Sequence, residues 1–194
     1  MTNASNGPRP SPLRIALCGA QGTGKTTLLG GLVARLPGLA VIPEQATEII
    51  REWGQIPRLM PAARKEEFQT EILRRTLALE AAHRARGFVS DRCVVDNLAY
   101  AQGLPCFEGL LDQVAGHLAT GPYSQVFLVR KSFPLVGNGV RSEDADYQEE
   151  IERRIEALFR RLGVPYLTVA SADRQGRVDE VLAAVESTPN RGRT

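Results

Sequence analysis

A glycine-rich segment near the amino terminus constrains the fold of this chain more than any other feature. Residues 19–27 read GAQGTGKTT, and they follow an apolar run at residues 13–18. Leucine and valine then recur at helical spacing over residues 28–36. Glycine tolerates the positive φ angles that a tight turn requires. We therefore expect a buried strand, a sharp turn and a helix in this order.

The same segment matches the pattern GxxxxGK[ST]. Backbone N–H groups at the start of a helix attract phosphate oxygens, and the helix dipole adds partial positive charge there. A lysine can then contact the β and γ phosphates, while the threonine hydroxyl joins the shell of Mg²⁺. The alternative is an ordinary glycine-rich turn with an exposed lysine. We predict a nucleoside triphosphate site, and the residues expected to form it are Gly19, Gln21, Gly22, Thr23, Gly24, Lys25, Thr26 and Thr27.

Short apolar runs alternate with longer segments of helical spacing along the rest of the chain. This alternation is typical of an α/β fold with a mostly parallel sheet. The runs expected to form strands are residues 13–18, 39–42, 88–90, 126–129 and 165–170. A polar segment, residues 131–146, is expected to be a movable loop before a helix capped by Asp146. We expect one domain over residues 13–186 between flexible segments at 1–12 and 187–194.

Charged residues directly follow two of the predicted strands. Glu44 comes shortly after the second strand, and Asp91 and Arg92 come after the third. Open α/β sheets bind ligands beyond the carboxyl ends of their strands, so all three residues are candidates for a site. Each also has a structural interpretation: Asp91 could cap a helix, Arg92 could pair with a carboxylate, and Glu44 could complement a helix N-terminus. Arg141 is the candidate for a cation that closes over the phosphate, and the alternative is an exposed arginine.

These segments together make the chain similar to P-loop nucleoside and nucleotide kinases over about residues 13–186. It most resembles the ribosylnicotinamide kinase domain of bifunctional NAD-biosynthesis regulators, within a broad group of AAA-like kinases. The resemblance rests on GAQGTGKTT, SDRCVVDNLAYAQG at 90–103, GNGVRSEDADYQEEI at 137–151, GVPYLTVAS at 163–171, and Asp173 with Arg174. The segment EEFQTEILRR at 66–75 is also similar to deoxynucleoside kinases, in which the equivalent of Gln69 holds a base.

The resemblance implies a three-layer sandwich with a five-stranded parallel sheet in the order 2-3-1-4-5 and a lid after the fourth strand. It also implies ATP as the phosphate donor, Thr26 and Asp91 as metal-binding residues, and Arg174 packed on adenine. A carboxylate near Glu44 or Asp91 would receive the hydroxyl proton of the acceptor. The residues that would hold the acceptor are Glu44, Gln69 and Arg92, although a glutamine on a charged helix such as Gln69 is usually solvated. The residues expected to act in catalysis are Lys25, Glu44, Asp91, Arg92 and Arg141.

Composition and missing motifs argue against several other classes of protein. The 24 basic and 22 acidic residues give a net charge of +2, too little for dedicated binding to a nucleic-acid backbone. No apolar run reaches the roughly 20 residues of a membrane span. The three cysteines lack metal-ligand spacing, which predicts reduced thiols and no zinc site in a cytoplasmic protein. The NKxD motif of GTPases and the LSGGQ motif of transport ATPases are absent.

The sequence therefore predicts a small-molecule kinase that uses ATP and Mg²⁺ to phosphorylate a hydroxyl group of a nucleoside-like acceptor, such as nicotinamide riboside. Related lids carry Asp-Gly before the arginine, whereas Asn138, Gly139 and Val140 precede Arg141 here, which leaves the acceptor's identity open. The alternative from another class is a nucleotide-dependent regulatory ATPase that acts on a protein partner, since one fold hosts many functions. A polynucleotide end kinase is less favoured because the charge is near neutral. A homodimer is compatible with each of these functions.

Overall fold

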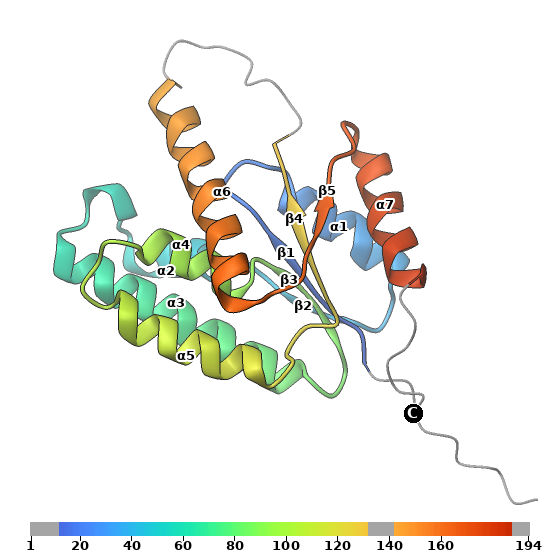
Figure 1. Ribbon diagram of the computed structural model, residues 1–194, viewed down its shortest axis with the longest axis horizontal. Coiled ribbons are helices and arrows are strands. Elements are labelled where there is room, and N and C mark those ends of the chain that lie inside the picture. Colours follow the sequence, from blue (N-terminus) through green and yellow to red (C-terminus); the bar gives the residue numbers. More distant parts are fainter. Residues whose placement is uncertain (1–11, 132–141, 188–194) are drawn as a thin grey trace, which may run out of the picture.

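Five parallel strands form one sheet in the order β2-β3-β1-β4-β5 (Figure 1). The computed structural model describes residues 12–131 and 142–187. The strands are β1 (Arg14–Cys18), β2 (Ala40–Ile42), β3 (Phe88–Asp91), β4 (Gln125–Val129) and β5 (Leu167–Val169). The predicted α/β class and sheet order are confirmed.

The register of the strands brings the ends of β1, β3 and β4 to one edge of the sheet. Leu17 of β1 lies opposite Asp91 of β3 and also opposite Phe127 of β4. Because the pairing is parallel, the segments that follow these strands all leave the sheet at the same edge. The glycine-rich loop after β1 and the residues after β3 are therefore neighbours in space, although they are far apart in the sequence.

Helices cover both faces of the sheet, and alternate side chains of each strand point to opposite faces (Figure 1). Ile15 and Leu17 pack against α1 and α7, whereas Ala16 and Cys18 face α3, α4, α5 and α6. This arrangement gives the three layers that were predicted. The helices are α1 (Lys25–Arg35), α2 (Gln45–Trp53), η1 (Pro57–Leu59), α3 (Ala62–His83), α4 (Val94–Ala101), α5 (Phe107–Ala119), α6 (Ser142–Leu162) and α7 (Arg174–Ser187).

Helix α2 begins directly after β2 and packs along α3. The contact is apolar and includes Ile49, Met60, Phe68 and Ile72. Pro43 separates the strand from the helix, and Glu44 is the N-cap residue of α2. Packing against α3 therefore fixes the start of α2, and with it Glu44, at the carboxyl end of the sheet.

Two predicted elements have wrong boundaries. The last strand, β5, covers Leu167–Val169 and not 165–170. Helix α6 begins at Ser142, so the predicted cap at Asp146 and the predicted extent of the loop, 131–146, are not correct. The run SEDAD at 142–146 offers several residue types that can start a helix, so the local pattern does not select one of them. The predicted lid falls on residues 132–141 and lies outside the described residues. Among the described residues, no helix combines the length and apolar character needed to cross a membrane.

Candidate active site

The loop after β1 turns tightly because its glycines adopt positive φ angles. The φ angle is 140° at Gly19, 73° at Gly22 and 89° at Gly24. A Cβ atom on Gly19 would lie 2.6 Å from the carbonyl oxygen of Val129, so a side chain cannot fit at this position. Helix α1 then starts at Lys25. The predicted succession of strand, tight turn and helix is confirmed.

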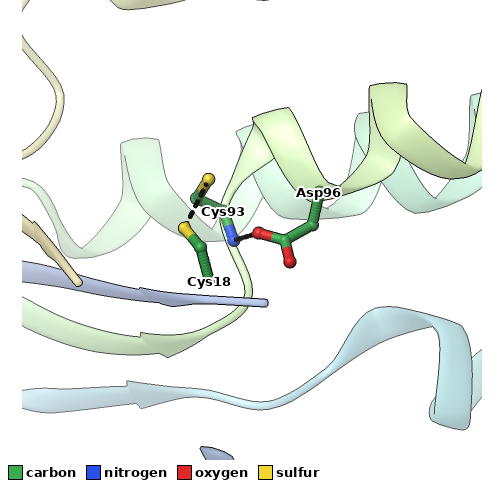
Figure 2. Close-up of side chains that lie close together, drawn as sticks. All are labelled: Cys18, Cys93 and Asp96. Carbon is green, nitrogen blue, oxygen red and sulfur yellow. Dashed lines mark hydrogen bonds between the residues drawn. The ribbon is translucent and has the colours of Figure 1, made fainter. Parts of the chain in front are cut away.

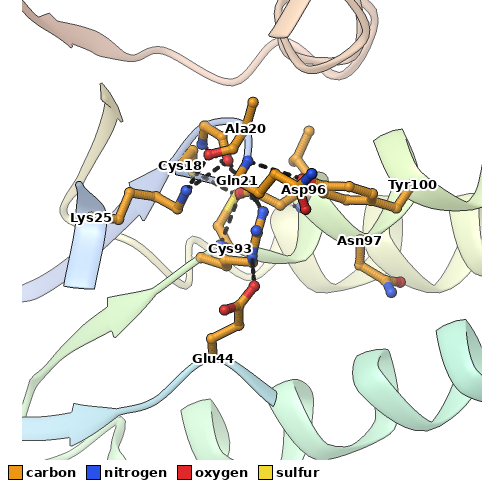
Figure 3. Close-up of polar contacts among 12 residues, drawn as sticks. Cys18, Ala20, Gln21, Lys25, Glu44, Cys93, Asp96, Asn97 and Tyr100 are labelled. Carbon is orange, nitrogen blue, oxygen red and sulfur yellow. Dashed lines mark hydrogen bonds and ion pairs between the residues drawn. The ribbon is translucent and has the colours of Figure 1, made fainter. Parts of the chain in front are cut away.

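Lys25 folds back into this turn (Figure 3). Its Nζ donates hydrogen bonds to the carbonyl oxygens of Gly19 at 2.9 Å and Ala20 at 2.6 Å, and to Thr23 Oγ1 at 3.3 Å. The residue is only 5% exposed. Burial, helped by the charge of Arg92, lowers the pKa of Lys25 to about 8, although nearby carboxylates act in the opposite direction. The ammonium group therefore lies within the turn that is predicted to bind phosphate.

Thr26 and Asp91 meet where α1 begins and β3 ends. Thr26 Oγ1 donates a hydrogen bond of 2.6 Å to Asp91 Oδ2. Burial raises the pKa of Asp91, and the hydrogen bond from Thr26 and the charge of Lys25 partly oppose this rise. A hydroxyl oxygen and a carboxylate oxygen are ligand types that suit Mg²⁺. These two residues therefore fit the ion that the sequence predicts and would hold it beside the turn.

Arg92 links the end of β3 to the loop and to α2. Its φ angle is 89°, which is uncommon for a residue with a side chain. Arg92 Nε donates to Glu44 Oε1 in a partly buried ion pair, and Nη1 donates to the carbonyl oxygen of Gly19 at 3.1 Å. The Cζ atom lies 5.0 Å from the centre of the Tyr100 ring, which is consistent with a cation–π contact. The predicted residues Glu44 and Arg92 are thus brought together beside the loop.

Glu44 points from the start of α2 toward the loop (Figure 3). Its second oxygen, Oε2, accepts a hydrogen bond of 2.9 Å from Thr47 Oγ1. Burial alone would raise the pKa of Glu44, but the charge and the hydrogen bond of Arg92 lower it below its ordinary value. The carboxylate is therefore ionised at neutral pH, and its position at the helix start matches the structural interpretation of Glu44 as well.

The amino-acid sequence matches a family model described as an AAA domain over residues 14–177. The chain belongs to this AAA domain family. A search of curated protein sequences gives no match. Solved structures with a similar fold include NadR in complex with NR, at 17% identity and a TM-score of 0.64. Two kinases are similar as well. Thymidylate kinase from Ehrlichia chaffeensis has 14% identity and a TM-score of 0.62, and deoxyadenosine kinase from M. mycoides with bound dCTP has 14% identity and a TM-score of 0.64.

The comparison with NadR covers 94% of this chain and 52% of the NadR chain, so the present chain spans about half the length of that protein. Each comparison with a kinase covers 91% of this chain and 100% of the other. At these low identities the likeness concerns the fold. The AAA domain described here has a P-loop nucleoside kinase-like fold, as the resemblance implied.

Asp96 lies at the centre of this candidate site, and the sequence analysis missed it. Its carboxylate is fully buried, and Oδ1 accepts a hydrogen bond of 2.9 Å from the backbone N–H of Gly19. The same oxygen lies 3.4 Å from Arg92 Nη1, and Oδ2 accepts the N–H of Cys93 at 3.1 Å. Asp96 therefore ties the loop to the start of α4. Its place three residues after the N-cap, where an acidic residue often closes a capping box, was the available signal.

Arg177 of α7 also holds the loop, through the backbone of Thr23, and the sequence analysis missed this residue too. Its Nη1 donates to the carbonyl oxygen of Thr23 at 2.6 Å, and Nε donates to that of Ser171 at 2.8 Å. Nη2 donates to the carbonyl oxygen of Arg130 at 3.0 Å, just after β4. The side chain is 3% exposed. By contrast Arg174, predicted to lie on adenine, is exposed at the first residue of α7.

Gln69 is buried between α3 and α4, which rules out a solvated helix position. It is 8% exposed, and Asn97 Nδ2 donates to its backbone carbonyl at 3.1 Å and to its Oε1 at 2.8 Å. Within the described residues, Asn97 Oδ1 is buried and accepts no hydrogen bond. The Gln69 side-chain oxygen thus already accepts a hydrogen bond from Asn97, and a role of Gln69 in binding an acceptor stays a prediction.

The remaining predicted residues occupy less enclosed positions. Gln21 and Thr27 are exposed, and the backbone N–H of Gln21 donates to the hydroxyl of Tyr100 at 3.2 Å (Figure 3). Tyr100 therefore anchors the tip of the loop to α4. Arg141, the predicted lid cation, lies outside the described residues.

Proposed function

We propose that this chain transfers the γ-phosphoryl group of ATP, with Mg²⁺, to a hydroxyl group of a small nucleoside-like acceptor. One observation carries the proposal: Gly19 joins two sets of groups that phosphoryl transfer needs. Its carbonyl oxygen accepts hydrogen bonds from Lys25 on the triphosphate side and from Arg92, which pairs with Glu44, on the other side. A donor site and an acceptor site would therefore share one short piece of backbone.

The donor half would be built from the loop and the two residues that follow it. The Lys25 ammonium group now bonds backbone carbonyls. On ATP binding it would exchange these neutral partners for phosphate oxygens, which make stronger, charge-assisted hydrogen bonds. Thr26 and Asp91 would hold Mg²⁺, which when bound neutralises negative charge on the β and γ phosphates. The predicted cation of the lid, Arg141, would add countercharge.

The acceptor half would lie beyond Glu44 and Arg92. An ionised Glu44 can accept a hydrogen bond from a hydroxyl group and orient it for attack, while Arg92, held by Glu44 and Asp96, supplies fixed positive charge. Phosphoryl transfer has a loose transition state, so positioning and countercharge matter more than a strong base. One neighbouring structure, NadR, holds NR, and another neighbour is named as a deoxyadenosine kinase, which supports an acceptor of the nucleoside type here, nicotinamide riboside being one candidate.

The test is an assay with purified chain, Mg²⁺, ATP and a panel of acceptors. The panel contains nicotinamide riboside, the common nucleosides and deoxynucleosides, and thymidine monophosphate, and products are identified by mass spectrometry. We expect one phosphorylated product, which Lys25→Met should abolish. ATP hydrolysis that no acceptor changes, with no phosphorylated product, would contradict the proposal and favour the regulatory ATPase instead.

A further inference from the structure

Two buried cysteines lie against each other (Figure 2), and one of them directly precedes the loop after β1, residues 19–24, which is the proposed phosphate-binding loop. Cys18 is the last residue of β1, directly before Gly19. Cys93 is the N-cap residue of α4, directly after Arg92. Their Sγ atoms are 2.9 Å apart, and both residues are buried. The parallel pairing of β1 with β3 brings these two positions together.

The spacing of the sulfur atoms favours a covalent bond over a shared metal ion. A disulfide has an S–S length of about 2.0 Å, so the atoms need to approach by only about 0.9 Å. Two thiolates on one tetrahedral zinc ion would instead stand about 3.8 Å apart. Asp96 is the third side chain that could ligate a metal ion between the two sulfurs, but its oxygens already accept the N–H groups of Gly19 and Cys93. A metal ion would have to separate the sulfurs and break these hydrogen bonds.

We propose that a peroxide oxidises Cys18 and Cys93 to a reversible disulfide, and that this disulfide weakens binding of nucleoside triphosphate at the adjacent loop. In the first step one sulfur attacks a peroxide oxygen, the O–O bond breaks, and a sulfenic acid and water form. In the second step the other sulfur attacks the sulfenic acid, the S–S bond forms, and hydroxide leaves and takes up the thiol proton. Two thiols and hydrogen peroxide thus yield one disulfide and two waters. A dithiol reductant reverses the reaction.

A chain of contacts connects the disulfide to the loop. The Sγ atom of Cys93 accepts the N–H of Val95 at 3.4 Å, and the N–H of Cys93 is bound by Asp96. Asp96 in turn holds the N–H of Gly19, whose carbonyl oxygen binds Lys25. Drawing Cys93 toward Cys18 moves the first turn of α4 and so disturbs the Asp96–Gly19 hydrogen bond. The loss of one such bond corresponds to a fall in affinity on the order of tenfold.

This effect rests on the proposed binding of ATP, so the experiment measures the bond and the binding separately. We would use the full chain with Cys106→Ala, because tryptic cleavage after Arg92 leaves Cys93 and Cys106 in the same peptide. After peroxide treatment and a non-reducing digest, we expect peptide 15–25 joined to peptide 93–130. Calorimetry would then compare ATP affinity in reduced, oxidised and re-reduced samples. The expected result is a roughly tenfold loss of affinity on oxidation, with full recovery on reduction.

Matched variants complete the test. Cys18→Ala and Cys93→Ala should each abolish the joined peptide and the effect of peroxide on ATP affinity, and the mapping in the Cys106→Ala chain stands even if neither variant folds. Absence of the joined peptide from folded, peroxide-treated protein would overturn the inference, as would a complete disulfide that leaves ATP affinity unchanged. Failure of the reduced protein to bind ATP would contradict the proposed function itself and would also refute the effect on affinity. If the reduced protein binds ATP and the oxidised protein binds it equally well, only this inference is refuted.

Discussion

Replacing Asp96 with asparagine tests whether a buried carboxylate holds the phosphate-binding loop in place. Both carboxylate oxygens accept backbone N–H groups, that of Gly19 at 2.9 Å and that of Cys93 at 3.1 Å. Asparagine has one oxygen and one NH₂ group, so one of these buried N–H groups would face a donor. An unsatisfied buried donor costs about 1–3 kcal/mol, and the loss of a charged acceptor for Arg92 adds about 1 kcal/mol. We expect Asp96→Asn to lower the free energy of unfolding by about 2–4 kcal/mol.

Urea unfolding followed by circular dichroism measures this loss. The corresponding fall in Tm is roughly 5–15 °C for a chain of this size. Asp112→Asn is the matched control, because Asp112 is exposed on α5 and should change stability by less than about 0.5 kcal/mol. If the Asp96→Asn protein is as stable as this control, then the carboxylate does not hold the loop and the reasoning is refuted.

Three further predictions concern the loop. Gly19→Ala should destabilise the fold by at least about 2 kcal/mol, whereas Gly30→Ala, in open space on α1, should stabilise it by about 0.5–1 kcal/mol; equal melting temperatures would contradict this. ATP affinity should fall between about pH 7 and 9, because Lys25, with its pKa of about 8, loses its charge there; calorimetry with Lys25→Arg should show a flatter profile. Thr26→Ala and Asp91→Asn should each raise the Mg²⁺ concentration needed for half-maximal ATP binding roughly tenfold. An unchanged Mg²⁺ titration would exclude both residues as metal ligands.

The sequence was sufficient to predict the architecture and to place several charged residues at the same end of the sheet. The apolar runs and the glycine-rich turn are local patterns, and the resemblance supplied the sheet order. Because parallel strands end at one edge, residues that follow different strands meet there, as Thr26 with Asp91 and Glu44 with Arg92 show. The substrate-binding role of Gln69 and the lid role of Arg141 stay predictions.

The residues that hold the loop in place could not be derived in the same way. Asp96 and Arg177 act through backbone groups of Gly19 and Thr23, and side-chain patterns do not reveal these partners, although the capping-box position of Asp96 signals its bond to the N–H of Cys93. Arg177 lies three positions after Arg174 in α7, so the choice between the two arginines depends on how the helix is rotated against the sheet. The start of α6 was misplaced because the SEDAD run at 142–146 allows more than one helix start.

The carbonyl oxygen of Gly19 carries a further consequence, because it is shared by two cations. Lys25 Nζ lies 2.9 Å from it and Arg92 Nη1 lies 3.1 Å from it. If a bound triphosphate drew Lys25 away, Arg92 would be left as the cationic partner of that oxygen. An acceptor that engages Arg92 would correspondingly leave the oxygen to Lys25. Under the proposed function, the donor half and the acceptor half of the site would thus influence each other through a single peptide group, and the coupling free energy is the same in both directions.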